Sequence, residues 1–169
     1  FLNNAAPVRD ASGRIVAGVV AELDVTERRA AEGALREERD RARLYFETAG
    51  VMLLVLGTDG KVVQINRAGA DILGRPPEEI VGKDWVGTFL PERERAVMGE
   101  VFARFVADRA DAPSEMENLV LCSDGRERLI AWRNAVLRDG QGRFLATISS
   151  GQDVTALRAA EARLRDSEE

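Results

Sequence analysis

Two hydrophobic periodicities alternate along this chain of 169 residues. Short runs rich in apolar and β-branched residues, typical of strands, occupy the segments 14–23, 51–56, 61–65, 115–122, 127–138 and 144–152. Helical spacing is found at 25–49, 66–73, 77–80, 85–89, 91–107 and after Thr155. The pattern predicts a strand and a long helix, then two strands, several helices, three strands and a closing helix.

The segment 91–107 has the pattern of a complete amphipathic helix. Its apolar residues lie three or four positions apart, so we expect one face to contact a core: Val97, Val101, Phe102 and Phe105. Short Asp-Gly turns at 58–60, 123–125 and 139–142 separate neighbouring strands, which predicts antiparallel pairing between them.

The chain also repeats itself at a constant offset of 129 residues. Residues 7–40 align without gaps onto residues 136–169, so that Gly13 matches Gly142 and Asp24 matches Asp153. Both copies contain an Arg-Asp turn, a strand-like run, Asp-Val-Thr and a charged helix. The repeat predicts the end of one structural unit followed by one complete unit.

Composition narrows the classes of protein and partner. The 24 Lys and Arg and the 29 Asp and Glu residues are mixed along the helices, with a net charge of −5, so no nucleic acid is expected as a partner. The sequence has no apolar run approaching the roughly 20 residues of a membrane-spanning helix, so no membrane contact by this segment is expected. A single Cys fits a reducing compartment, which predicts a cytoplasmic location.

Residues for metal or catalytic chemistry are few. The sequence contains no His, the usual axial ligand of haem, and Cys122 on an apolar strand is expected to behave as a small hydrophobic residue. No nucleophile, base and orienting group can be placed together, so the chain is not expected to be an enzyme, and no metal site is expected.

The helical segment 25–49 has a narrow seam in which Leu35, Ala42 and Ala49 recur every seven residues. Two short heptads are fewer than a coiled coil normally needs. The segment is therefore either a solvated linker helix or half of a parallel dimeric coil, and the pattern leaves both open.

The element order and several motifs resemble the PAS sensor domain. The resemblance rests on Thr58-Asp59-Gly60, Ile65-Asn66-Arg67-Ala68, Glu79-Ile80-Val81-Gly82-Lys83, Ser123-Asp124-Gly125 and the closing Asp153-Val154-Thr155. It implies an α+β fold with a five-stranded antiparallel sheet, short helices on one face and a linker helix at each end. It also implies a division into the C-terminal hairpin of a preceding PAS domain (1–26), a linker helix (27–45), a PAS domain (46–155) and a helix leading to a following domain (156–169).

Similarity to the flavin-binding, light-sensing subfamily indicates which strand residues face inward. Trp85 stands where that subfamily has its reactive cysteine, Val120 and Ile130 replace its flavin-holding asparagines, and Gly151 replaces its glutamine. The resemblance therefore implies no flavin mononucleotide photochemistry. Residues two apart share a face of a strand, which predicts a candidate ligand pocket made of Asn118, Val120, Trp132, Asn134, Thr147 and Ser149, together with Trp85.

The polar residues of this pocket allow two interpretations. In one, Asn118 and Asn134 bind a small molecule; in the other, they bond to each other, to backbone or to water, and Trp132 only fills a core. No cofactor is predicted, although a flavin adenine dinucleotide redox sensor is an alternative because some PAS domains hold it with an inward Trp and Asn. Here Trp132 and Asn134 are its sole support.

The leading functional hypothesis is a non-catalytic regulatory module of a multi-domain signalling protein, either a two-component histidine kinase or a cyclic-di-GMP enzyme. The signal is expected to reach an output domain outside this chain through Asp153, Val154, Thr155, Leu157 and Leu164. The alternative is a ligand-free dimerisation spacer. In a homodimer, the expected contacts are Leu35, Ala42, Tyr45, Phe46, Phe144 and Ile148.

Overall fold

The computed structural model describes residues 2–107 and 113–168. The chain divides into two compact units, Phe1–Leu44 and Tyr45–Glu169. Most of the predicted elements are present, and their ends lie within one residue of the predicted positions. Among the described residues, no helix is both long enough and apolar enough to cross a membrane.

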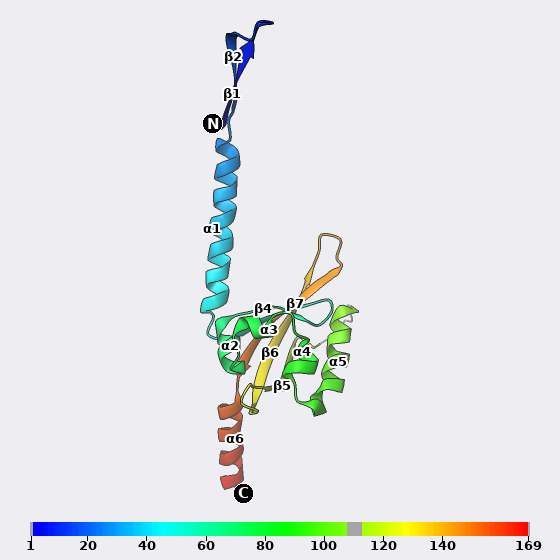
Figure 1. Cartoon of the computed structure of the whole chain (residues 1–169). Coiled ribbons are helices and arrows are strands. Elements are labelled where there is room, and N and C mark those ends of the chain that lie inside the picture. Colours follow the sequence, from blue (N-terminus) through cyan, green and yellow to red (C-terminus); the bar gives the residue numbers. More distant parts are fainter. Residues whose placement is uncertain (1, 108–112, 169) are drawn as a thin grey trace. The chain divides into compact units, whose positions relative to one another are not determined.

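The first unit begins with an antiparallel hairpin of β1 (Leu2–Arg9) and β2 (Ile15–Leu23) (Figure 1). One carboxylate oxygen of Asp10 organises its turn by accepting hydrogen bonds from the backbone N–H groups of Ser12 (2.9 Å) and Arg14 (3.0 Å). Gly13 supplies the left-handed residue of the turn, with φ 84°. Every residue of β2 is exposed, so this hairpin lacks the packing that normally stabilises paired strands.

Helix α1 (Thr26–Thr48) follows the hairpin and has no buried residue. Arg28 and Glu32 form an i,i+4 ion pair at 3.2 Å, and Arg41 and Glu38 an i,i+3 pair at 3.3 Å. Such exposed pairs each contribute only a few tenths of a kcal/mol, roughly 0.2–0.5. Leu35, on the predicted seam, is 72% exposed.

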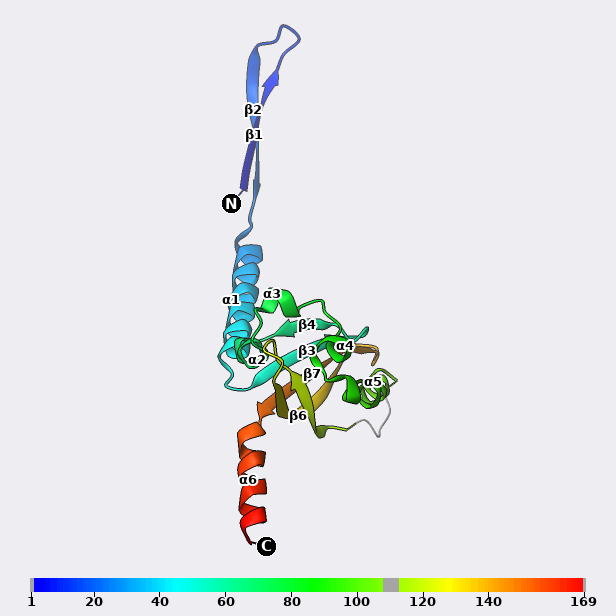
Figure 2. The ribbon, with the colours of Figure 1, turned by 60° about the horizontal axis from the view of Figure 1, so that its bottom comes forward.

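The second unit is built on an antiparallel sheet with the strand order β4-β3-β7-β6-β5. Its strands are β3 (Met52–Gly57), β4 (Val62–Ile65), β5 (Glu115–Leu121), β6 (Glu127–Arg138) and β7 (Phe144–Asp153). The helices are α2 (Arg67–Leu73), α3 (Pro77–Ile80), α4 (Trp85–Phe89), α5 (Glu92–Val106) and α6 (Thr155–Glu168). The fold class expected from the sequence is confirmed (Figures 1 and 2).

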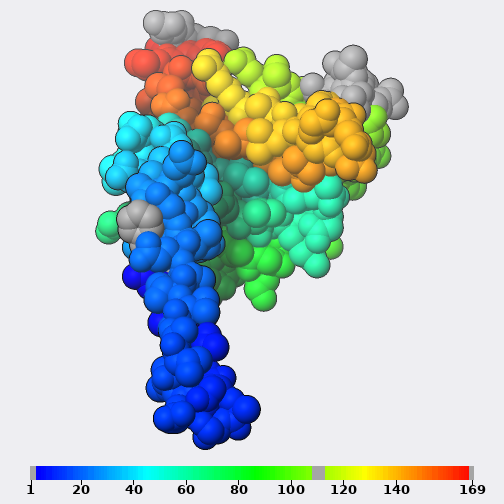
Figure 3. Space-filling model, turned by 90° about the horizontal axis from the view of Figure 1, so that it is seen from above, coloured from blue at the N-terminus to red at the C-terminus, as the bar shows by residue number. Residues whose placement is uncertain are grey.

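The core lies between one face of the sheet, called the inner face here, and helices α2 to α4. Met52, Leu54 and Leu56 of β3 contribute alternate side chains to it, and Leu73 of α2 and Phe89 of α4 meet them from the helical side. β6 and β7 continue past the ends of β5 and β3, and their connecting turn lies on the surface of this unit (Figure 3).

Asn66 holds the start of the second unit together and is completely buried. Its side-chain amide donates hydrogen bonds to the backbone carbonyls of Phe46 (3.1 Å) and Val51 (2.9 Å). Its Oδ1 accepts from the N–H groups of Leu53 (2.8 Å) and Gly69 (3.1 Å), and the second of these caps α2. Asn66 thus joins the chain before β3 to the N-terminus of α2.

At each edge of the sheet, part of the edge strand's backbone is hydrogen-bonded within this unit. At the β5 edge, Glu94 of α5 accepts a hydrogen bond from the backbone N–H of Leu119 at 2.9 Å. At the β4 edge, Val62 exchanges backbone hydrogen bonds with Gly82 (2.8 Å) and Lys83 (2.9 Å). Covered edges reduce the tendency of a sheet to pair with another chain.

The sequence prediction for α5 was wrong at Val97, which is 60% exposed. Phe105 is buried, and Val101 and Phe102 are half-buried. The contact face of the helix is narrower than predicted and also contains Met98, which packs against the core. Val97 lies beside that face rather than on it.

Candidate functional site

The inner face of β5, β6 and β7 brings together most of the residues predicted to line a pocket. A single cavity is lined by Asn118, Trp132, Asn134, Thr147, Ser149 and Trp85. Val120 is fully buried but belongs to the adjacent core and does not line the cavity. The strand alternation used in the sequence analysis therefore placed these side chains on the correct face.

The other walls of this inner cavity are apolar and were missed as pocket residues. They are Leu54, Leu56, Val86, Leu90, Met98, Val101, Phe102, Phe105 and Met116. The amphipathic pattern of 91–107 indicated that the α5 residues among them face inward. Periodicity alone, however, does not distinguish a cavity wall from a packed core.

Aromatic side chains occupy much of the space between sheet and helices. Trp85 of α4 and Trp132 of β6 meet edge to face, with ring centroids 5.9 Å apart, and Trp85 also stacks at a tilt on Phe89 at 5.2 Å. The remaining cavity has a volume of about 60 Å³. Typical small-molecule sites measure roughly 300–1,000 Å³, so a ligand the size of a flavin does not fit unless these rings move.

The amide groups in the cavity do not bond to each other, but both bond to backbone, as one of the sequence-based alternatives allowed. Asn134 accepts a hydrogen bond from the hydroxyl of Ser149 (2.7 Å), and its amide nitrogen donates to the carbonyl of Pro113 (3.3 Å). The amide nitrogen of Asn118 donates to the carbonyl of Leu119 at 3.0 Å. These bonds fix the orientation of both amides.

Two oxygen atoms on buried side chains have no hydrogen-bond partner among the described residues, namely Oδ1 of Asn118 and the hydroxyl oxygen of Thr147. The side chains are 7% and 2% exposed. Each of the two oxygens keeps some accessible surface inside the cavity, because among the described residues the fully buried side-chain atom without a hydrogen-bond partner is Nε of Arg75. These oxygens are therefore the groups that a bound molecule could satisfy.

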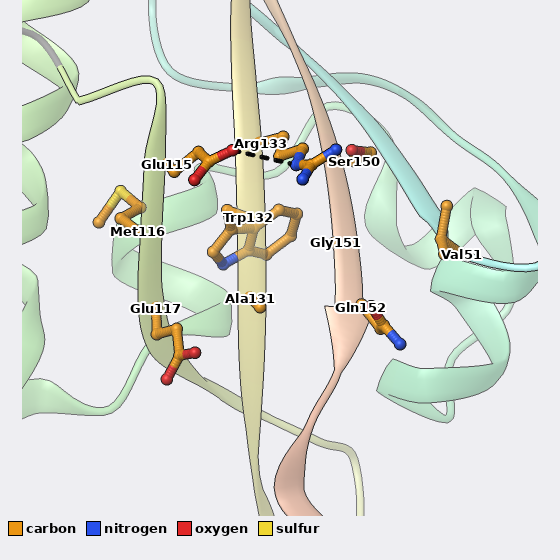
Figure 4. A pocket seen from close by; sticks show the side chains of 10 residues that line it. All are labelled: Val51, Glu115, Met116, Glu117, Ala131, Trp132, Arg133, Ser150, Gly151 and Gln152. Carbon is orange, nitrogen blue, oxygen red and sulfur yellow. Dashed lines mark ion pairs between the residues drawn. The ribbon is translucent and has the colours of Figure 1, made fainter. Parts of the chain in front are cut away.

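A second hollow, of about 570 Å³, lies over the outer face of the sheet (Figure 4). Its lining is Val51, Glu115, Met116, Glu117, Ala131, Trp132, Arg133, Ser150, Gly151 and Gln152. Glu115 and Arg133 are paired across it at 3.2 Å, with both side chains largely exposed. It is larger than the inner cavity, but its lining includes the charged side chains of Glu115, Glu117 and Arg133, which already have partners, so we regard the inner cavity as the candidate ligand site.

The connection from β7 into α6 is tied to β6 by a small polar network. One carboxylate oxygen of Asp153 accepts from the backbone N–H (3.0 Å) and hydroxyl (2.6 Å) of Thr155, and the other pairs with Arg128 at 3.2 Å. The hydroxyl of Thr155 accepts from the N–H of Leu129 at 2.8 Å, and Val154 is buried. The first turn of α6 is thereby fixed to β6.

Arg158 extends this attachment from α6 to β5. It forms ion pairs with Glu117 of β5 and, at 2.9 Å, with Glu161 of its own helix. The hydrogen bonds from Arg158 lower the pKa of the Glu117 carboxyl, and the two carboxylates raise the pKa of the guanidinium. Leu157 and Leu164, predicted to transmit a signal, are 54% and 66% exposed.

The residues predicted for dimerisation lie on exposed or half-exposed surfaces. Phe144 and Ile148 are half-buried on the outer face of β7. Ala42 and Tyr45 on α1 are exposed, as is Leu35, and Phe46 is half-buried.

Comparisons with known proteins place this fold among related sequences and structures. A family model described as the PAS fold matches residues 46–159. The two-component sensor PprA of Pseudomonas aeruginosa is 28% identical over 158 residues, which cover 93% of this chain and 17% of PprA. The chain thus spans about a sixth of the length of that relative.

Solved structures with this fold share low sequence identity with the chain. The PAS domain of an HTR-like protein from Haloarcula marismortui aligns with a TM-score of 0.60 at 21% identity, covering 74% of this chain and 98% of that one. The PAS domain of the RpfR quorum-sensing receptor from Cronobacter turicensis, in complex with BDSF, aligns with a TM-score of 0.53 at 22% identity. The alignment covers 63% of this chain and 96% of that one.

Proposed function

The chain belongs to the PAS fold family, and we propose that its second unit is a non-catalytic sensor that binds a small molecule in the inner cavity. The observation that carries this proposal is the pair of unpartnered oxygens, on Asn118 and Thr147, inside a cavity with apolar walls. Such a combination is the usual composition of a small-molecule site.

The similarity to PprA supports a place in a two-component signalling protein. Of the two parent proteins expected from the sequence, a sensor histidine kinase is therefore favoured over a cyclic-di-GMP enzyme. The output domain would lie outside this chain.

The ligand is proposed to have an apolar body. The RpfR PAS domain has been solved in complex with BDSF and with C12:0, and the α5 side of the cavity here is lined by Met98, Val101, Phe102 and Phe105. Because Met98 and Phe102 are only half-buried and methionine repacks readily, this wall is the part that would yield to a ligand larger than the present cavity.

A change at the cavity would reach α6 through β5. Asn118 lines the cavity, and its neighbour Glu117 holds Arg158 of α6. A ligand that repositions Asn118 would shift Glu117 and with it the attachment of α6. The size of the response is limited by the difference in the affinities of the ligand for the two arrangements.

The first unit is proposed to contain the closing hairpin of a preceding domain of the same fold. The turns are alike in detail: Asp139 accepts from the N–H groups of Gln141 (2.8 Å) and Arg143 (2.9 Å), as Asp10 does from the corresponding residues of its turn. Pro7 matches Val136, which lies beyond the last residue of β6 that pairs with β5. A proline, which lacks an N–H, is tolerated at such a position.

A second candidate function is a dimerisation spacer. The outer face of β7 carries Phe144, Ala146 and Ile148 at alternate positions, and Leu119 and Leu121 of β5 lie on the same face of the sheet. An exposed apolar patch of this kind favours contact with a partner, which would be a second copy of this chain. A spacer needs no ligand, so the two functions are separable.

Native mass spectrometry of the freshly purified chain, followed by denaturing mass spectrometry of the same sample, tests the sensor function. A mass excess that is lost on denaturation would support a ligand site. A chain mass without excess, at twice the value for one chain, would support the spacer instead.

A further inference from the structure

We infer that the ligand of the inner cavity is an uncharged molecule that has an apolar body and donates a hydrogen bond through a hydroxyl or amide group. This inference rests on the proposed sensor function and specifies the ligand of the same site. It follows from the charges around the cavity, from the type of its unpartnered polar atoms and from its size.

The described lining of the cavity contains no ionisable acid or base. All 15 lining side chains are aliphatic, aromatic, thioether, hydroxyl or amide groups. A charge brought into such surroundings loses its hydration without gaining a counter-ion, which is unfavourable. Carboxylates and ammonium groups are therefore disfavoured as ligand head groups.

Charged side chains adjacent to the lining already have partners. Glu94 accepts the edge N–H of Leu119, and Arg95 donates through Nε to the carbonyl of Leu90 at 3.1 Å. Glu117, which points to the other face of β5, is paired with Arg158. Recruiting any of them as a counter-ion would break a contact that positions α5 or α6.

The unpartnered atoms require a donor on the ligand. The amide nitrogen of Asn118 donates its hydrogen bond to the carbonyl of Leu119. The atom of this side chain without a partner is Oδ1, which can only accept a hydrogen bond. An ionised carboxylate has no proton to donate and would be repelled by this oxygen. The hydroxyl of Thr147 can both donate and accept, so it completes a site for one O–H or N–H group.

The size of the cavity limits the apolar body. At about 60 Å³ it is less than half the roughly 150 Å³ of an engineered apolar cavity that binds benzene. A short chain therefore enters only by displacing the half-buried side chains of Met98, Phe102 and Met116.

Three probes of equal length and different charge test the inference: 1-hexanol, hexanoate and hexylammonium at pH 7.5. The two tryptophans of the sequence, Trp85 and Trp132, both line the cavity, so intrinsic fluorescence responds to this site; because Trp132 also borders the outer hollow, variants are needed to locate the response. We expect a saturable change with 1-hexanol and at least 10-fold weaker responses with both ions. A 10-fold ratio corresponds to about 1.4 kcal/mol.

Matched variants locate the response. Asn118→Leu removes the acceptor at similar volume and should weaken hexanol binding about 5-fold or more, whereas Ser150→Ala on the outer face should leave it unchanged. Thr147→Val provides a second, nearly isosteric test if Asn118→Leu does not fold.

The outcomes separate this inference from the sensor function. Hexanoate or hexylammonium binding as tightly as hexanol, with sensitivity to Asn118→Leu, overturns the uncharged ligand and leaves the sensor function standing. No saturable response to any probe overturns both. Hexanol binding that is equal in Asn118→Leu, Thr147→Val and the unmodified chain overturns the assigned donor site.

Discussion

The ring of Trp132 occupies the space directly beside the backbone of Gly151, its partner across β6 and β7. A Cβ atom at position 151 would lie 2.6 Å from Cζ3 of Trp132 and 2.7 Å from Cγ2 of Ile130, far closer than atoms in a packed core approach. The glycine is therefore required for the tryptophan to lie across the sheet. Because the ring reduces the inner cavity, this pair also sets how much room a ligand has.

Gly151→Ala is expected to destabilise the second unit. The added methyl group must push Trp132 and Ile130 aside, and overpacking of this kind typically costs about 1–3 kcal/mol. Urea unfolding followed by circular dichroism measures the loss. Gly140→Ala is the control because a Cβ atom at position 140 would have no neighbour within 4 Å, and equal effects of the two substitutions would contradict the packing argument.

Asn66→Ala is expected to lower the free energy of unfolding by about 3 kcal/mol or more. The substitution leaves the carbonyls of Phe46 and Val51 and the N–H of Leu53 without their buried partner, at roughly 1–3 kcal/mol for each group that water cannot reach. The midpoint of thermal unfolding provides the measurement. Asn4→Ala, on the exposed strand β1, should change it little, and a comparable shift would argue against the role of Asn66.

Glu117→Gln is expected to loosen α6. Loss of the charge weakens the ion pair with Arg158, so amide hydrogen exchange over 155–168 should become faster. Glu115→Gln, which removes the more exposed pair with Arg133, is the matched control and should leave exchange in α6 unchanged.

The same pair gives α6 a pH dependence. Hydrogen bonding to Arg158 lowers the pKa of Glu117 in the folded state, so its stabilisation is complete above the ordinary carboxyl pKa and is lost as pH falls through the lowered value. Protection of α6 should stay constant from neutral pH down to the ordinary carboxyl pKa, fall at lower pH in the unmodified chain, and fall less in Glu117→Gln. Identical profiles would remove Glu117 as the cause.

Cys122 is expected to react slowly with a thiol reagent in the folded protein. It is buried, its Sγ donates to the carbonyl of Ile72 at 3.2 Å, and burial raises the pKa of the thiol, so little thiolate is present. Reaction with a chromogenic disulfide should accelerate on unfolding in urea. As the sequence has one cysteine, the signal is unambiguous. Fast reaction in buffer would mean that the β5 end of the sheet opens readily.

Ile148→Asp tests the dimerisation spacer. A charge in the centre of the outer apolar patch should convert a dimer to a monomer in sedimentation velocity. Leu145→Asp is the control because this residue is 51% exposed and lies on the opposite face of β7. An unchanged sedimentation coefficient for Ile148→Asp would count against this interface.

The sequence predicted the elements because apolar runs are separated by clear turn residues, and it predicted the inward face of the sheet because the resemblance to the flavin-binding subfamily fixed the register of β5 to β7. The sequence-based prediction failed where packing between elements determines which side chains contact the core and which line the cavity. Val97 has helical spacing with Val101 yet lies off the contact face, and Val120 shares a face with Asn118 but packs into the core. The small volume left by Trp85 and Trp132 depends on ring orientations that no sequence pattern specifies.

The pairing of Met52 with Gly151 has a mechanical consequence. The chain enters the sheet at Met52, shortly after α1, and leaves it beyond Gly151 into α6, so entry and exit lie at the same end of two neighbouring antiparallel strands. Tension between the two helices would therefore peel β3 from β7 one rung at a time, beginning at the rung beside Trp132. Trp132, which lines the cavity, is the β6 partner of Gly151 at that first rung.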